Sequence, residues 1–198
     1  QMSGRKGLYV SADSVYDILK EKTKEETKKR HPEMNDSKIE TIAHSVSVGT
    51  IRYEMIKQDL DKIITFDLTK SLSLEGDTSP YIQYTHARAS RILEKSGRVP
   101  TIDVDFTLLK ENSELDLIKN IGLFNLQVRD AANNLSPKVI ARYCYDLAVS
   151  FNSFYEKSKV LELGDVELEN SRLCLVNSFK IVLEKALDLL GIQAPDRM

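Results

Sequence analysis

Tryptophan is absent from this chain of 198 residues, and cysteine and histidine are scarce, with two and three copies. Two cysteines, Cys144 and Cys174, cannot by themselves form a zinc site or a disulfide framework. Their apolar, helix-like surroundings predict buried, reduced thiols, as expected of a cytoplasmic protein. Because no two histidines have the spacing of metal ligands, we expect no metal site.

Long apolar runs are also missing. No stretch approaches the roughly 18 apolar residues of a membrane-spanning helix, and no charged-then-apolar segment at the N-terminus indicates secretion. We therefore expect no membrane partner. Nucleotide-binding Gly-x-Gly-x-x-Gly and Walker loops are absent, and the acidic pair Asp103 and Asp105 lies in a connecting segment without a partner base. The residues alone show no complete active site.

Neither sign of charge dominates, since 28 Lys and Arg stand against 30 Asp and Glu. A net charge of −2 gives no global basic field, so binding to a nucleic acid would need a local patch. Residues 81–98 supply one, because Arg88, Arg91, Lys95 and Arg98 are accompanied only by Glu94.

Helical periodicity and capping signals predict five or six helices without a convincing strand ladder, which indicates an all-α bundle. Residues 60–76 read as irregular or briefly extended. The helices are expected over about 14–30 after the cap Asp13, from the capping box Ser37-x-x-Glu40 to Ile56, over 79–96, from the capping box Ser113-x-x-Asp116 to Asn133, from Ser136-Pro137 onward, and over 168–190 before Gly191.

The last two helices carry the clearest apolar stripes. The expected core residues are Ile140, Tyr143, Leu147, Phe151 and Phe154 in the first, and Leu173, Val176, Phe179, Leu183, Leu187 and Leu190 in the second.

One face of the helix expected over 79–96 combines aromatic and cationic side chains. Tyr81, Tyr84, Arg88 and Arg91 follow at spacings of three, four and three, so they share this face. Rings stack on bases and Arg neutralises phosphate, which suits a single-stranded RNA loop. An amphipathic helix with exposed polar tips has the same pattern, so the local pattern leaves both interpretations open.

The N-terminal loop Met2-Ser-Gly-Arg-Lys-Gly7 is doubly cationic and carries a hydroxyl group. Such a loop can close on phosphates through its charges and backbone N–H groups. A short Gly/Lys/Arg stretch at a chain end is also commonly only a tail.

Taken in order, these segments resemble the arginyl-tRNA synthetases, a family of class I aminoacyl-tRNA synthetases. Met2–Gly7 is similar to the family's KMSKS loop. The most specific run is Ser73-Leu-Glu-Gly-Asp-Thr-Ser-Pro-Tyr-Ile-Gln-Tyr-Thr-His-Ala-Arg88. The ending Leu189-Leu-Gly-Ile-Gln-Ala-Pro-Asp-Arg-Met198 is similar to the family's C-terminus. We therefore interpret the chain as a fragment of a longer protein.

The resemblance implies ATP-dependent attachment of L-arginine to tRNA(Arg), with Mg²⁺ accompanying ATP. Ser3, Arg5 and Lys6 match the loop that stabilises the transferring phosphates, although Gly4 stands where the general motif has its second Lys. The family's nucleotide-binding fold and HIGH signature are absent from these residues. We therefore expect this fragment alone to be inactive and to bind no cofactor.

The resemblance also implies the domain organisation. Residues 1–58 correspond to the end of the catalytic domain, and residues 59–198 to the α-helical anticodon-binding, or DALR, domain. Tyr81, Tyr84 and Arg88 match residues that read the anticodon loop, and Met198 matches a residue that closes the pocket. Tyr155 is a further candidate for the RNA surface.

We expect a monomer, as is usual in the family. The competing hypothesis is a stand-alone helical module that binds a protein partner without tRNA specificity, and such a module would show an exposed apolar patch.

Overall fold

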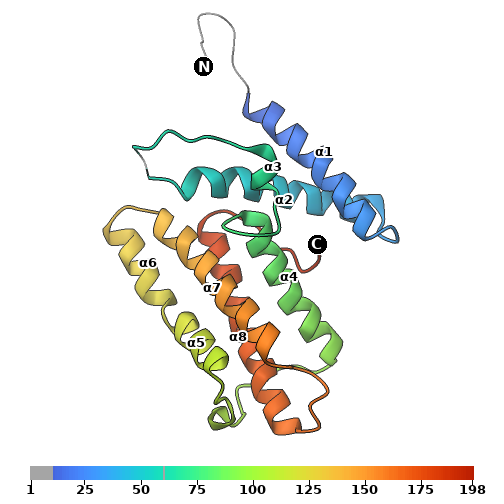
Figure 1. Ribbon diagram of the computed structural model, residues 1–198, viewed down its shortest axis with the longest axis vertical. Helices are drawn as coiled ribbons and strands as arrows, with labels where there is room; N and C mark the ends of the chain where they lie inside the picture. The colour runs from blue at the N-terminus through green and yellow to red at the C-terminus, as the bar shows by residue number, and fades with distance from the viewer. Residues whose placement is uncertain (1–10, 60) are drawn as a thin grey trace, which may run out of the picture.

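The computed structural model describes residues 11–59 and 61–198, and this part of the chain consists of helices and connecting segments without a strand (Figure 1). The all-α prediction is confirmed. The α-helices are α1 (Ala12–Arg30), α2 (Asp36–Ile56), α3 (Leu68–Ser71), α4 (Ser79–Ser96), α5 (Asn112–Gly122), α6 (Phe124–Asn133), α7 (Lys138–Lys157) and α8 (Val166–Leu189), and a 3₁₀ turn, η2, spans Phe106–Leu108. No described helix combines the length and the apolar content needed to cross a membrane.

Helices α1 and α2 pack against each other above the rest of the molecule, and α2 rests on α4 (Figure 1). The cap of α1 is Ser11, whose hydroxyl accepts the Ser14 backbone N–H at 3.1 Å, so the prediction of Asp13 was wrong. The cap of α2 is Asn35, two residues before the predicted capping box at Ser37. In both cases a short polar side chain just upstream accepts one of the free N–H groups of the first turn.

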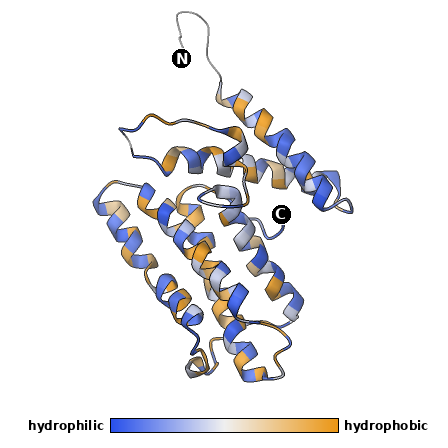
Figure 2. Ribbon diagram, in the orientation of Figure 1, coloured by the Kyte–Doolittle hydropathy of each residue, from blue (hydrophilic) through white to orange (hydrophobic). Residues whose placement is uncertain are grey.

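Helices α4 to α8 form the bundle. The long helices α7 and α8 lie at its centre, with α4 on one side and α5 and α6 on the other (Figure 1). Apolar and polar residues alternate along each of these helices, as in amphipathic helices (Figure 2). Every residue of the two predicted apolar stripes is buried, and the rings of Phe151 and Phe179 stack with centroids 4.0 Å apart. The core prediction is confirmed.

The single helix expected from Ser113 to Asn133 is two helices, α5 and α6, separated at Leu123. Gly122 is the last residue of α5, and glycine is a poor helix former because it loses the most backbone freedom. The break lets both pieces pack along α7. Sequence periodicity also missed the single-turn helix α3, which Asp67 caps through the Thr69 and Lys70 N–H groups.

Helix α8 ends at Leu189 with Leu190 as its cap, and Gly191 follows, as predicted, with a left-handed backbone angle φ of +65°. The following segment, residues 192–198, turns back toward α4 (Figure 1). This reversal brings the C-terminal residues to the side of the bundle where the candidate site lies.

Candidate nucleic-acid interface

A groove of about 940 Å³ opens between α4, the end of α7, the α7–α8 loop, the C-terminal segment and the α1–α2 turn. Three of the predicted RNA-binding residues, Tyr84, Arg88 and Met198, line it together. Arg91 and Tyr155 line it as well. Residues from both ends of the sequence therefore meet in one concave surface.

The Arg88 guanidinium contacts two tyrosine rings. Its guanidinium carbon is 5.1 Å from the ring centroid of Tyr84 on α4 and 5.0 Å from that of Tyr155 on α7. Stacking on aromatic faces stabilises the cation and leaves N–H groups at the guanidinium edge able to form hydrogen bonds. The groove thus presents aromatic rings and a planar set of donors side by side.

Tyr81 lies outside the lining of this groove. Its ring is 5.9 Å from that of Tyr145, and its hydroxyl accepts a hydrogen bond at 2.9 Å from Asn152. Asn152 also accepts a hydrogen bond from Arg88, so it connects Tyr81 to the groove. Sequence reasoning missed Asn152, because the two polar residues Asn152 and Ser153 between the core residues Phe151 and Phe154 carry no signal of their own.

The groove has an excess of positive charge within an acidic chain. Glu94 pairs with Arg197 and lies 3.5 Å from Arg91. Within the described part of the chain, Arg30 and Lys95 form no ion pair. The lining comprises six cations, Arg30, Arg88, Arg91, Lys95, Lys159 and Arg197, and four acids, Glu33, Glu156, Glu162 and Asp196. Such local excess attracts a polyanion even where net charge does not.

One face of α4 holds the C-terminal segment. Its residues Gln83, His86, Ser90 and Glu94, spaced by three or four, each bind this segment. Gln83 donates to the Gln193 carbonyl at 2.8 Å, and Ser90 donates to the Asp196 carboxylate at 2.8 Å. A hydrogen bond and ion pair with Lys180 lowers the pKa of Asp196. These contacts place Met198 at the groove.

Met198 separates the groove from a smaller apolar slot of about 90 Å³. Tyr84, Arg30 and Met198 line both cavities, and Leu72, Leu74 and Pro80 complete the apolar wall of the slot. Met198 therefore forms part of the wall of both cavities.

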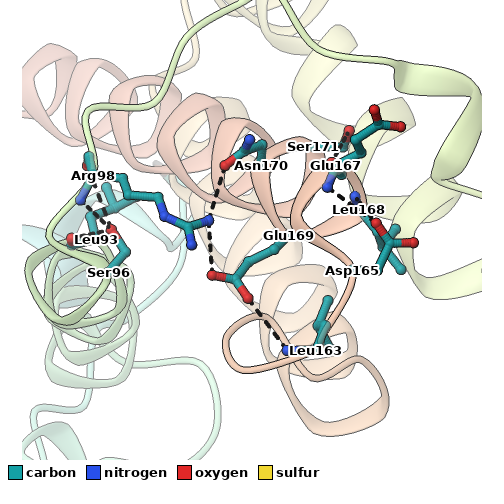
Figure 3. Close-up of polar contacts among 10 residues, drawn as sticks. All are labelled: Leu93, Ser96, Arg98, Leu163, Asp165, Glu167, Leu168, Glu169, Asn170 and Ser171. Atoms are coloured by element: carbon teal, nitrogen blue, oxygen red, sulfur yellow. Dashed lines mark hydrogen bonds and ion pairs between the residues drawn. The ribbon is translucent and has the colours of Figure 1, made fainter.

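The α7–α8 loop forms the far wall of the groove and is anchored by buried charges. The Arg172 guanidinium donates to the Lys159 carbonyl at 2.6 Å and pairs with Glu114 at 2.7 Å. At the end of the loop, Glu169 accepts the Leu163 N–H at 3.3 Å and pairs with Arg98 at 3.0 Å (Figure 3). The wall is thereby fixed to α5, α8 and the end of α4.

Ser3, Arg5 and Lys6, the residues matched to the phosphate-binding loop, lie outside the described residues. In the described ranges, no cluster of three or more His, Cys, Asp and Glu side chains could hold a metal ion.

Residues 82–198 match the family model of the DALR anticodon binding domain. The chain is 40% identical over 197 residues to an arginine–tRNA ligase of Methanothrix thermoacetophila, and the alignment covers 100% of this chain and 35% of the relative. The chain thus spans about a third of the length of such relatives.

Two solved structures share the fold. The arginyl-tRNA synthetase of Thermus thermophilus superposes with a TM-score of 0.89 at 35% identity, covering 100% of this chain and 33% of that one. The arginyl-tRNA synthetase of Plasmodium falciparum gives a TM-score of 0.82 at 27% identity, covering 96% of this chain and 34% of that one.

Proposed function

This chain belongs to the DALR anticodon-binding domain family, and from that premise we propose that it recognises the anticodon loop of tRNA(Arg) as part of an arginine–tRNA ligase. The observation that carries the proposal is the contact of the Arg88 guanidinium with the rings of both Tyr84 and Tyr155 in a groove with excess positive charge. Anticodon loops expose single-stranded bases, which such surfaces bind.

Each part of the groove suits one part of an RNA loop. Unstacked bases pack on the rings of Tyr84 and Tyr155, at roughly 1–3 kcal/mol per base. The guanidinium edge of Arg88 donates to acceptors on a base or a phosphate. Met198 closes the apolar end, and Arg91 and Lys95 neutralise backbone phosphates. Tyr81 contributes from beneath the groove through Asn152.

In the whole enzyme, ATP with Mg²⁺ would activate L-arginine for transfer to the tRNA. We assign Ser3, Arg5 and Lys6 to the phosphates of ATP and the described residues to tRNA binding. We place the boundary between the catalytic part and the anticodon-binding domain near residue 58. The proposal further includes a cytoplasmic location and a monomeric state.

Equilibrium binding to a tRNA(Arg) transcript over a series of salt concentrations tests this function. The logarithm of the affinity should fall linearly with the logarithm of salt concentration, because each neutralised phosphate releases counterions. Affinity for the transcript that does not change with salt would contradict the proposal. The stand-alone protein-interaction module would then be favoured, with the exposed Val99 and Ile102 of the α4–α5 connection as its first candidate contacts.

A further inference from the structure

Asn152 makes a complete set of hydrogen bonds next to the groove. Its side chain is 8% exposed, and its NH₂ group donates to the Tyr81 hydroxyl at 2.9 Å and to the Thr85 hydroxyl at 3.0 Å. Its carbonyl oxygen accepts from Nη1 of Arg88. Because a guanidinium group has only donors, the amide oxygen must face Arg88. Thr85 in turn donates to the Tyr81 backbone carbonyl at 2.8 Å, so the amide is held in one orientation.

The hydrogen bond to Asn152 fixes the direction of the Arg88 N–H groups, which the aromatic contacts do not fix. The Arg88 guanidinium carbon lies 5.1 Å from the ring centroid of Tyr84 and 5.0 Å from that of Tyr155, and this cation–π attraction holds the charge near the rings without selecting which N–H group points where. Anchoring Nη1 at Asn152 makes that selection. The remaining N–H groups then have a fixed direction before the ligand arrives, which reduces the entropy lost on binding.

The side-chain amide of Asn152 is neutral, so its hydrogen bond leaves the positive charge of Arg88 uncompensated. Arg88 forms no ion pair with any residue that the structure describes, whereas neighbouring Arg197 pairs with Glu94. A carboxylate at position 152 would hold the guanidinium more tightly, but it would cancel the charge that an RNA ligand needs. A neutral acceptor orients the guanidinium without competing for it.

We propose that Asn152 is a positioning residue for RNA recognition, which fixes the Arg88 guanidinium between Tyr84 and Tyr155 while leaving its charge available to the ligand. This inference rests on the proposed tRNA-binding function. It assigns a recognition role to a buried residue that itself lies outside the lining of the groove.

Two substitutions at position 152 separate orientation from charge. Asn152→Leu removes the acceptor, and Asn152→Asp keeps an acceptor but adds a negative charge. Binding of the full chain to a tRNA(Arg) transcript is measured for each variant, alone and combined with Arg88→Ala, over a series of salt concentrations. Thermal unfolding of every variant is recorded in parallel.

We expect Asn152→Leu to weaken binding about tenfold, and to weaken it no further in the Arg88→Ala background, because both changes remove the same interaction. Asn152→Asp should keep the fold, weaken binding, and reduce the slope of affinity against salt by about one, because Arg88 no longer neutralises a phosphate or an anionic acceptor. A purely structural role would lower stability without changing that slope. If Asn152→Leu does not fold, the slope of RNA affinity against salt concentration for Asn152→Asp distinguishes the positioning role from the structural one.

The matched control is Asn170, which accepts a hydrogen bond from Arg98 at 3.1 Å outside the groove (Figure 3). Asn170→Leu and Asn170→Asp should leave RNA affinity and its salt slope unchanged. The inference is overturned if the effects of Asn152→Leu and Arg88→Ala add, or if Asn152→Asp binds with the wild-type slope. If the wild-type chain binds transcripts with native and altered anticodons equally, this inference and the proposed function both fail. If the wild-type chain prefers the native anticodon but the Asn152 variants show no effect beyond that of the Asn170 variants, this inference alone fails.

Discussion

Nε2 of His31 donates a hydrogen bond at 2.9 Å to the backbone carbonyl oxygen of Met198, which lies 167 positions later in the chain. His31 belongs to the turn between α1 and α2, and both residues line the groove. The first two helices therefore help to position the last residue of the candidate site. A residue from the turn between the first two helices thus contributes directly to the groove.

Replacing His31 with alanine should weaken binding of tRNA(Arg) about threefold to tenfold, because Met198 loses its anchor and the hydrogen bond contributes about 0.5–1.5 kcal/mol. The control His44→Ala removes a comparable bond within the same helix pair, from His44 to Tyr16 at 2.8 Å, away from the groove. Equal losses of RNA affinity in the two variants, measured by equilibrium titration, would contradict a specific role for His31.

Gly191→Ala should destabilise the protein strongly. Gly191 has a φ of +65°, and an added Cβ would lie 1.7 Å from Nη1 of Arg52, which donates to the Gly191 carbonyl at 2.8 Å. Backbone strain alone costs about 1–2 kcal/mol, and the displacement of Arg52 adds to it. Chemical denaturation of the variant measures the sum.

Two further variants separate strain from steric conflict at Gly191. Gly97 has a φ of +60°, and beyond its chain neighbours no atom of the described residues lies within 4 Å of an added Cβ, so Gly97→Ala should show the strain alone. In an Arg52→Ala background, the cost of Gly191→Ala should fall to that of Gly97→Ala. An unchanged cost in this background would show that Arg52 is not the obstacle.

Arg172→Ala should cost about 3–5 kcal/mol of stability, because it leaves the Glu114 carboxylate buried without its cation. Glu114 is fully buried, and Arg172 also holds the Lys159 carbonyl in the groove wall. The exposed pair of Arg142 and Asp146 provides the control, and Arg142→Ala should change stability by less than about 1 kcal/mol. Urea unfolding of both variants measures the difference, and similar values would contradict the assignment.

Stability should decrease as the pH falls below the ordinary histidine pKa of 6.5, owing to His86. Burial lowers the pKa of His86 in the folded chain, opposed by its hydrogen bond to the Pro195 carbonyl and by Asp196 and Glu184, and reinforced by Lys180. Its Nε2 atom is buried without a partner among the residues that the structure describes, so a second proton there would be unpaired. The unfolded chain therefore binds the proton first, and the free energy of unfolding falls from about pH 6.5 downward.

His86→Asn keeps a donor for the Pro195 carbonyl and does not titrate in this range. The variant should show a flatter dependence of unfolding free energy on pH between 7 and 5 than the wild type. An identical pH dependence in both proteins would show that the buried imidazole is not responsible.

Local sequence signals predicted the helices well where the residues that begin or end a helix are unambiguous. Thr78 with Pro80 and Gly97 define α4 at both ends, and Gly191 ends α8 with its left-handed backbone. Signals shared by neighbouring residues were less reliable, as at Ser11 and Asn35, because several short polar side chains compete for the same free N–H groups. The break at Leu123 depends on packing against α7, which periodicity does not contain.

The residues of the candidate site were likewise predictable where they share one helix and unpredictable where they come from distant segments. Helical spacing grouped Tyr84, Arg88 and Arg91, because residues three and four apart share a face. That spacing also included Tyr81, which the bundle turns toward Tyr145 and Asn152. Contacts between distant segments, such as Arg88 with Tyr155 and His31 with Met198, arise from the tertiary fold, and no local sequence pattern predicts them.

The most direct test of anticodon recognition is equilibrium binding of this chain to a tRNA(Arg) transcript, compared with the same transcript carrying a changed middle anticodon base, for the wild type and for Tyr84→Ala. We predict that the wild type prefers the native anticodon and that Tyr84→Ala loses this preference together with roughly 1–3 kcal/mol of binding free energy. Equal binding of both transcripts by the wild-type chain would contradict the account, because the groove around Arg88 would then not read the anticodon.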